Sequence, residues 1–427
     1  MTNPRQCVSF LTHLPLFEQR GYMDYVRQLD LSSYTVHGSG WSEASAKDKI
    51  TAAVLARWIL ACRRLQQLVV GDELMYTFLD PVMMQAVFTA HHRFLQVIDL
   101  AGFCDQRVTQ AMADLLENKD KKDENGDNDL AAFMPTSPSL QHHRPLGIVG
   151  HPQMPGQLTQ LSFHKCMALS PTRFFQPLFE QLQHHHLTRL DLAYTPVTNH
   201  VLSSLHPEKL THLNLQACRS LYCHRQEDPP LGLGSFLSRC VNLVELNLNI
   251  QFNGSPMRTQ FCRHCLTHWI LHDLPKMQQL RVLDLGGQGH IDDDLLAAMP
   301  LSILRQLRYL SLACVHLSYP ALQSALGHMK QLEYLNVTRV RSLQGSLPAL
   351  LMHCATKLPR LVVIEGADHR KAIAIPPSLA NHWFYHENGR RGYYARANVD
   401  PRFKYSQKLL LLDQQPQSPM LRYWCFS

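Results

Sequence analysis

Apolar residues recur along the chain in the pattern L-x-x-L-x-L, where x is mostly polar. The clearest copies are Leu187-Leu190-Leu192, Leu210-Leu213-Leu215, Leu243-Leu246-Leu248, Leu280-Leu283-Leu285, Leu307-Leu310-Leu312 and Leu332-Leu335-Val337. Looser copies are Val26-Leu29-Leu31, Leu65-Leu68-Val70, Leu95-Ile98-Leu100, Leu158-Leu161-Phe163 and Leu361-Ile364. Because alternate residues are apolar, each copy predicts a short strand, which a loop and a helix follow. Such a unit cannot bury its own apolar face, but stacked copies can.

The spacing of the copies predicts an α/β leucine-rich-repeat solenoid. Steps such as Leu190 to Leu213 and Leu283 to Leu310 lie within or close to the repeat length of roughly 20 to 29 residues. The expected shape is a horseshoe, with parallel strands on the concave face and helices on the convex face. The largest gap, Ile98 to Leu161, encloses a stretch of low complexity.

Changes in composition divide the chain into five segments. Residues 1–23 are expected to form a capping helix, and residues 24–116 and 158–365 carry the repeats. Residues 117–157 combine a charge run with Pro, Ser and Gly, so they predict a disordered insertion. Residues 366–427 are rich in aromatic and basic residues and predict a C-terminal cap or tail. Such residues can also stack on nucleic-acid bases, but no RNA-binding motif accompanies them, so no nucleic acid is expected.

Length and composition narrow the class of protein. The 427 residues are 45% apolar, enough for a large core, and the net charge of +7 is modest. No apolar stretch is long enough to span a bilayer, and the first residues lack the pattern of a secretory signal, so no membrane is expected. The twelve cysteines are scattered along a long chain, which favours reduced thiols and a cytoplasmic or nuclear location.

Candidate chemistry is sparse. Cys262, Cys265, His268 and His272 could supply four zinc ligands within eleven residues. The same stretch carries a helical apolar stripe, and one continuous helix cannot direct all four ligands to one point, so a repeat helix without metal is expected. Motifs typical of hydrolases, phosphate loops, dinucleotide folds and zinc proteases are absent from the sequence. Neither an enzyme nor a cofactor is therefore expected.

Cysteines follow the strand pattern or precede it, as at Cys218 and Cys240, positions that point into a repeat core. With FLSRCVNLVELNLNI (236–250), HLTRLDLAYTPVTNHVLSSL (186–205) and LRVLDLGGQGHIDDDLLAAM (280–299), the chain resembles the cysteine-containing repeats of F-box/LRR proteins and of the antagonist-of-mitotic-exit family. The resemblance implies a non-enzymatic protein whose sheet grips a protein, often to present it to an SCF-type ubiquitin ligase. The first residues of the chain resemble the segment that follows an F-box in fungal members of this group. The F-box itself is not seen, because the first strand pattern already begins at Val26.

The strand residues between the leucines point away from the predicted core and are expected to line up in two rows. One row holds Arg189, His212, Glu245, Val282, Tyr309 and Tyr334, and the other Asp191, Asn214, Asn247, Asp284, Ser311 and Asn336. The candidate residues for binding a protein on the concave face are Arg189, Asp191, His212, Asn214, Glu245, Asn247, Asp284, Tyr309, Tyr334 and Asn336.

The function that these observations favour is substrate recognition in an SCF-type ubiquitin ligase or a related cell-cycle role, with the SCF adaptor and cullin as further partners. The alternative is a stand-alone scaffold, or an inhibitor of a regulatory GTPase or enzyme, that acts without a ligase. A simple solvating role for the polar row also stays open.

Overall fold

Every copy of the apolar pattern forms a strand in the computed structural model, which describes residues 3–88, 93–113, 155–182, 187–223, 232–252, 255–256, 260–343, 345–368, 377–388 and 391–396. The strands that correspond to the copies are β1 (Gln28–Leu31), β2 (Gln67–Val70), β3 (Val97–Asp99), β4 (Gln160–Ser162), β5 (Arg189–Asp191), β6 (His212–Asn214), β7 (Glu245–Asn247), β10 (Val282–Asp284), β11 (Tyr309–Ser311), β12 (Tyr334–Asn336) and β13 (Val363–Asp368). A separate antiparallel pair is formed by β8 (Gln251–Phe252) and β9 (Ser255–Pro256).

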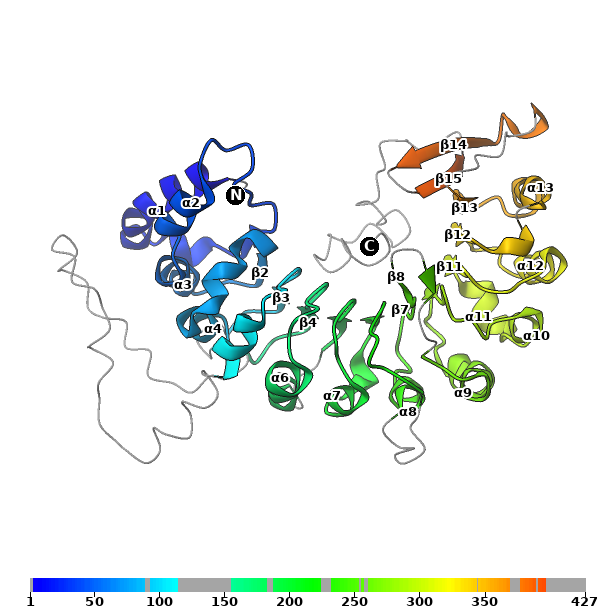
Figure 1. Cartoon of the computed structure of the whole chain (residues 1–427), viewed down its shortest axis with the longest axis horizontal. Helices are drawn as coiled ribbons and strands as arrows, with labels where there is room; N and C mark the ends of the chain where they lie inside the picture. Colours follow the sequence, from blue (N-terminus) through cyan, green and yellow to red (C-terminus); the bar gives the residue numbers. More distant parts are fainter. Residues whose placement is uncertain are drawn as a thin grey trace. The chain divides into compact units, whose positions relative to one another are not determined.

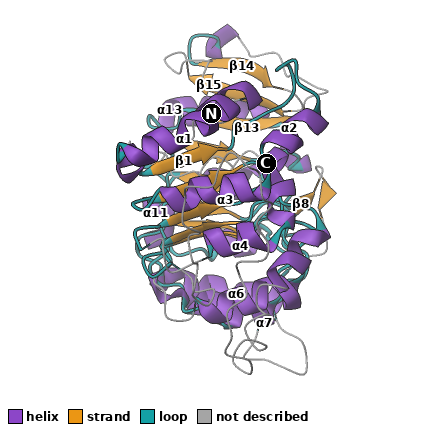
Figure 2. Cartoon of the chain, turned by 90° about the vertical axis from the view of Figure 1, so that its left-hand side faces the viewer, coloured by secondary structure: helices purple, strands orange, loops and turns teal. Residues whose placement is uncertain are grey.

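The strands formed by the copies of the apolar pattern belong to one open, mostly parallel sheet of thirteen strands, which confirms the α/β prediction. The last two members are β14 (Trp383–Asn388) and β15 (Arg391–Arg396), an antiparallel hairpin that pairs with β13 (Figure 2). The register places the central apolar residues of successive strands side by side, in the order Leu190, Leu213, Leu246, Leu283, Leu310, Leu335 and Ile364. Each of them is fully buried. The apolar pattern therefore forms one continuous row of core residues.

The first compact unit comprises Met1–Val97, Asp105–Leu158 and Thr172–Leu182. Its described helices include α1 (Pro4–Gln19), α2 (Glu43–Lys49), α3 (Ala52–Ala61), α4 (Pro81–Val87) and α6 (Gln176–Gln181). Trp58 on α3 is buried, and its ring centroid lies 4.7 Å from that of Phe10 on α1. The apolar periodicity of residues 44–62 would fit one continuous helix, but the structure has two, because the helix breaks at Ile50 and Thr51. The Thr51 side chain accepts a hydrogen bond from the Val54 N–H and starts a new helix.

The second compact unit comprises Ile98–Cys104, Thr159–Pro171 and Gln183–Ser427. Its described helices include α7 (Asn199–Ser203), α8 (Leu233–Ser238), α9 (Arg263–His268), α10 (Asp293–Ala297), α11 (Leu301–Gln306), α12 (Tyr319–Leu326) and α13 (Leu347–Lys357). They follow one another along one side of the strands of this unit (Figure 1). Several start at a polar cap, as where Thr198, Asp292 and Ser318 accept backbone N–H groups of the first turn.

The aromatic C-terminal segment packs through Trp383, which is fully buried and donates its indole N–H to the Leu351 carbonyl at 3.0 Å. The guanidinium of Arg396 lies 4.5 Å from the Trp383 ring centroid and donates to the carbonyls of Leu361, Cys354 and Leu358. Most of the insertion predicted at 117–157 lies outside the described residues, as does the segment from 397 onward. Among the described helices, none is long and apolar enough to cross a bilayer.

Candidate protein-binding face of the strands

The parallel register of the second unit aligns the polar strand residues in two rows. The first residues of the strands form the first-position row, which runs Gln160, Arg189, His212, Glu245, Val282, Tyr309, Tyr334 and Val363. The third residues form the third-position row, which runs Ser162, Asp191, Asn214, Asn247, Asp284, Ser311, Asn336 and Glu365. The rows contain every residue that the sequence proposes for partner binding, and β4 and β13 extend them at both ends.

The aspartate and asparagine side chains of the third-position row bond to their own backbone. In each, Oδ1 accepts the N–H two residues later at 2.9 to 3.1 Å, in the pairs Asp191 to Ala193, Asn214 to Gln216, Asn247 to Asn249, Asp284 to Gly286 and Asn336 to Thr338. Such Asx turns reverse the chain at the end of a strand. The row was expected to offer these oxygens to a partner; the structure instead uses one oxygen of each to close its own repeat.

Burial also separates most of the third-position row from solvent. Asp191, Asn214 and Asn247 are fully buried and Asp284 is 4% exposed, whereas Asn336 is half-buried. Burial raises the pKa of Asp284, against the opposing effect of hydrogen bonds from Gly286, Ser311 and Asn249. The Nδ2 atom of Asn249 lies 3.2 Å from Asp284 Oδ1.

Half of the first-position row is apolar and packs against itself. The rings of Tyr309 and Tyr334 are stacked, with centroids 4.7 Å apart and planes inclined by 17°. They form a buried cluster with Val282, against which Val362 and Val363 pack. Tyr309 and Tyr334 are only 2% and 5% exposed, so little of either ring is open to solvent. Adjacent strands lie about 4.8 Å apart, which is the distance at which rings in register stack and exclude water.

The other half of this row, made of Gln160, Arg189, His212 and Glu245, is polar. Glu245 is 1% exposed, and its Oε1 atom lies 3.3 Å from Nε2 of His212, which is half-buried. Neither carboxylate oxygen of Glu245 accepts a hydrogen bond from the described residues. The buried Nη1 atom of Arg189 likewise donates no hydrogen bond to any described residue. Burial lowers the pKa of Arg189, while the charge of Glu245 acts in the opposite direction. A buried carboxylate without donors is costly, so this arrangement is poised to accept a hydrogen-bond donor.

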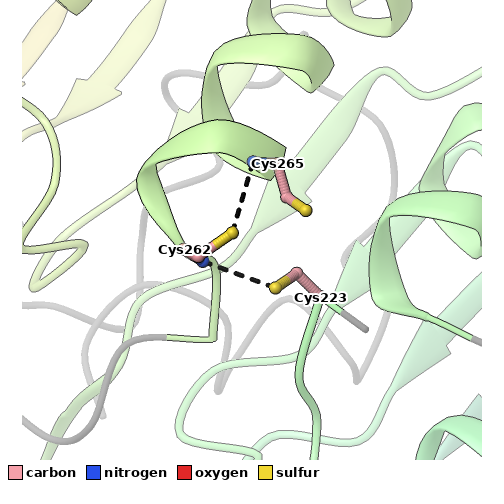
Figure 3. Close-up of side chains that lie close together, drawn as sticks. All are labelled: Cys223, Cys262 and Cys265. Atoms are coloured by element: carbon pink, nitrogen blue, oxygen red, sulfur yellow. Dashed lines mark hydrogen bonds between the residues drawn. The ribbon is translucent and has the colours of Figure 1, made fainter. Parts of the chain in front are cut away.

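The histidines and the cysteines of the candidate zinc motif do not gather at one point in the structure. The helical segment changes from α9 to a π turn at Trp269, and the rings of His268 and His272 pair with each other at 4.7 Å. The sulfur atoms of Cys262 and Cys265 instead meet that of Cys223, and the three atoms lie within 4.8 Å of one another (Figure 3). Sequence reasoning missed Cys223.

The described cysteines are thiols rather than disulfides. Burial raises the pKa of Cys265 to about 12, and its contacts with Cys262 and Cys223 add to the effect. At Cys262 burial acts in the same direction, but hydrogen bonds to its sulfur from Cys265 and Cys223 outweigh it and lower the pKa.

No family model matches the chain, and no curated protein matches it either. Among solved structures, one described as the crystal structure of a Rad7 and Elc1 complex in yeast is similar, with a TM-score of 0.43 and 13% sequence identity over 74% of this chain and 73% of that chain. The assignment of a leucine-rich-repeat-like fold therefore rests on the strand order and register of this chain.

Proposed function

We propose that the chain is a non-enzymatic, protein-binding repeat protein that recognises its partner at Arg189, His212 and Glu245, named here the charged patch. The observation that carries the proposal is the buried carboxylate of Glu245, whose oxygens accept no hydrogen bond from the described residues. Polar groups buried in this way are normally satisfied in the functional state. A cationic or N–H group of a bound protein would satisfy this one.

The position of the patch supports recognition rather than stability. The leucine row already supplies the core, and Arg189 and His212 keep part of their side chains accessible beside Glu245. A lysine or arginine of the partner could approach the Glu245 carboxylate beside these side chains, where water is largely excluded and a charge-assisted hydrogen bond is strong. In the finer form of the proposal, which rests on the sequence resemblance to F-box/LRR proteins, the partner is a substrate presented to an SCF-type ubiquitin ligase in the cytoplasm or nucleus.

The test is affinity purification of the full chain with quantitative mass spectrometry, on the wild type and on Glu245→Gln. This change removes the charge at almost constant shape. Glu208→Gln is the matched control, since Glu208 is exposed at the surface of the same unit. We expect Glu245→Gln to reduce recovery of the specific partner at least about tenfold, because losing one member of a buried charge pair costs about 2 kcal/mol or more. The control should retain it.

Equal recovery of every partner with Glu245→Gln and with wild type would rule out the charged patch. The ligase assignment has its own readout in the same experiment. Recovery of a cullin and its adaptor supports it, whereas a partner retained without either assigns the chain to stand-alone scaffolds or inhibitors of a GTPase or enzyme.

A further inference from the structure

Three cysteines from two distant segments converge in the second unit. Cys223 follows β6, whereas Cys262 caps the start of α9 and Cys265 lies in the first turn of that helix. All three are half-buried, and their sulfur atoms lie within 4.8 Å of one another (Figure 3). Backbone N–H groups already point at two of the sulfurs, from Cys262 to Cys223 and from Cys265 to Cys262, each at 3.4 Å.

The backbone around the cluster is held by buried amide side chains. Gln260 is 3% exposed, its side chain donates to the Cys218 carbonyl at 3.0 Å, and its carbonyl accepts the Cys223 N–H at 2.7 Å. On the other side, Asn199 donates to the Tyr222 carbonyl at 2.8 Å. These bonds fix Cys223 opposite α9 without any contribution from the sulfurs. The thiols are therefore brought together by the fold, as a metal site requires.

We propose that Cys223, Cys262 and Cys265 together bind one zinc ion, with the fourth coordination position open to water. Sulfur ligands select a soft or borderline metal such as zinc and disfavour magnesium and calcium, which take oxygen ligands. Tetrahedral zinc with bonds of about 2.3 Å places its sulfurs about 3.8 Å apart, so the cluster closes on the ion by shifts of about 1 Å. The bound ion would tie the segment after β6 to the start of α9.

This proposal is independent of the partner-binding function. It also revises the expectation of no metal, which considered the two histidines and did not include Cys223. The charge balance is simple, because each thiol that becomes a ligand releases its proton to solvent when the ion binds.

The direct test is cobalt titration of the full, tag-free chain, purified under reducing conditions. Thiolate-bound cobalt gives an intense sulfur-to-metal absorption in the near ultraviolet and visible bands typical of tetrahedral coordination. We expect saturation at about one equivalent and displacement of the cobalt by zinc. A titration without the sulfur-to-metal band overturns the proposal.

Serine variants then assign the ligands. Cys223→Ser, Cys262→Ser and Cys265→Ser should each weaken zinc binding at least about tenfold, because each removes one of three protein ligands. Cys104→Ser is the matched control, since Cys104 is an exposed thiol outside the cluster. Circular dichroism of each variant shows whether it is folded. Unchanged zinc affinity in the folded Cys223→Ser variant, or a disulfide among the three cysteines that persists under reducing conditions, contradicts a three-thiolate site.

Discussion

Replacing Tyr309 and Tyr334 by alanine, singly and together, tests whether the first-position row contains a second apolar core. Both rings are almost fully buried, and removing a buried aromatic side chain costs about 3 to 5 kcal/mol of unfolding free energy. The rings are also stacked at 4.7 Å, and such pairs interact by about 0.5 to 1.5 kcal/mol beyond their burial. The loss in the double variant should therefore be smaller than the sum of the two single losses by about that interaction energy.

Urea unfolding followed by circular dichroism measures these changes. Leu310→Ala provides the reference for the main core and should cost about 2 to 5 kcal/mol, since Leu310 is fully buried between Leu283 and Leu335. Tyr25→Ala is the matched control, because Tyr25 is 77% exposed and its removal should change stability by less than about 0.5 kcal/mol. If the double tyrosine variant unfolds like the Tyr25 control, the rings are not a core, and the row returns to the candidates for a partner surface.

Two further predictions concern the third-position row. Asp191→Ala should lower the unfolding free energy by about 1 to 3 kcal/mol, because the buried Ala193 N–H loses its acceptor, whereas Asp191→Asn keeps an acceptor and should lose less; thermal melts in which the two variants are equal would contradict the Asx-turn role. Burial raises the pKa of Asp284 above its ordinary value of 3.8. The contribution of Asp284 to the free energy of unfolding is therefore greatest below pH 3.8 and is lost as the pH rises through the folded-state pKa. Asp284→Asn should therefore exceed wild type in melting temperature at neutral pH and lose that advantage in acid, and equal melting temperatures at neutral pH would contradict it.

The strands could be predicted from the sequence because alternation is a local property. A leucine at every second position identifies the buried face of a strand wherever its neighbours lie, and the register then aligns Leu190 with Leu213 as expected. Helix ends were harder to predict from the sequence. The break before Thr51 depends on whether its hydroxyl caps a helix or faces solvent, and both options leave the apolar periodicity of residues 44–62 almost unchanged.

Burial on the outward rows depends on neighbouring strands, which a single strand pattern does not contain. Tyr309 alternates with leucines as an exposed residue would, and neighbours on other strands, among them Tyr334 and Val282, remove it from water. The cysteine cluster has the same origin. Cys223 lies 39 residues before Cys262 in the sequence. The two meet because the backbone carbonyl of Gln260 accepts the Cys223 N–H and so joins the two segments. No rule on the spacing of metal ligands in sequence predicts a contact between residues so far apart along the chain.

These contacts change where recognition is expected. Each Asx residue uses one oxygen on its own backbone, although Asp191 Oδ2 and Asn214 Nδ2 are buried without a hydrogen-bond partner among the described residues, and the stacked tyrosines bury each other. Glu245 differs, because its carboxylate is buried and accepts no hydrogen bond from the described residues. Evolution of a stable repeat alone favours an apolar residue at such a position, as Val282 shows one strand further along. We therefore propose that a bound group pairs with this charge, so that recognition lies over β5 to β7 rather than over the tyrosines of β11 and β12.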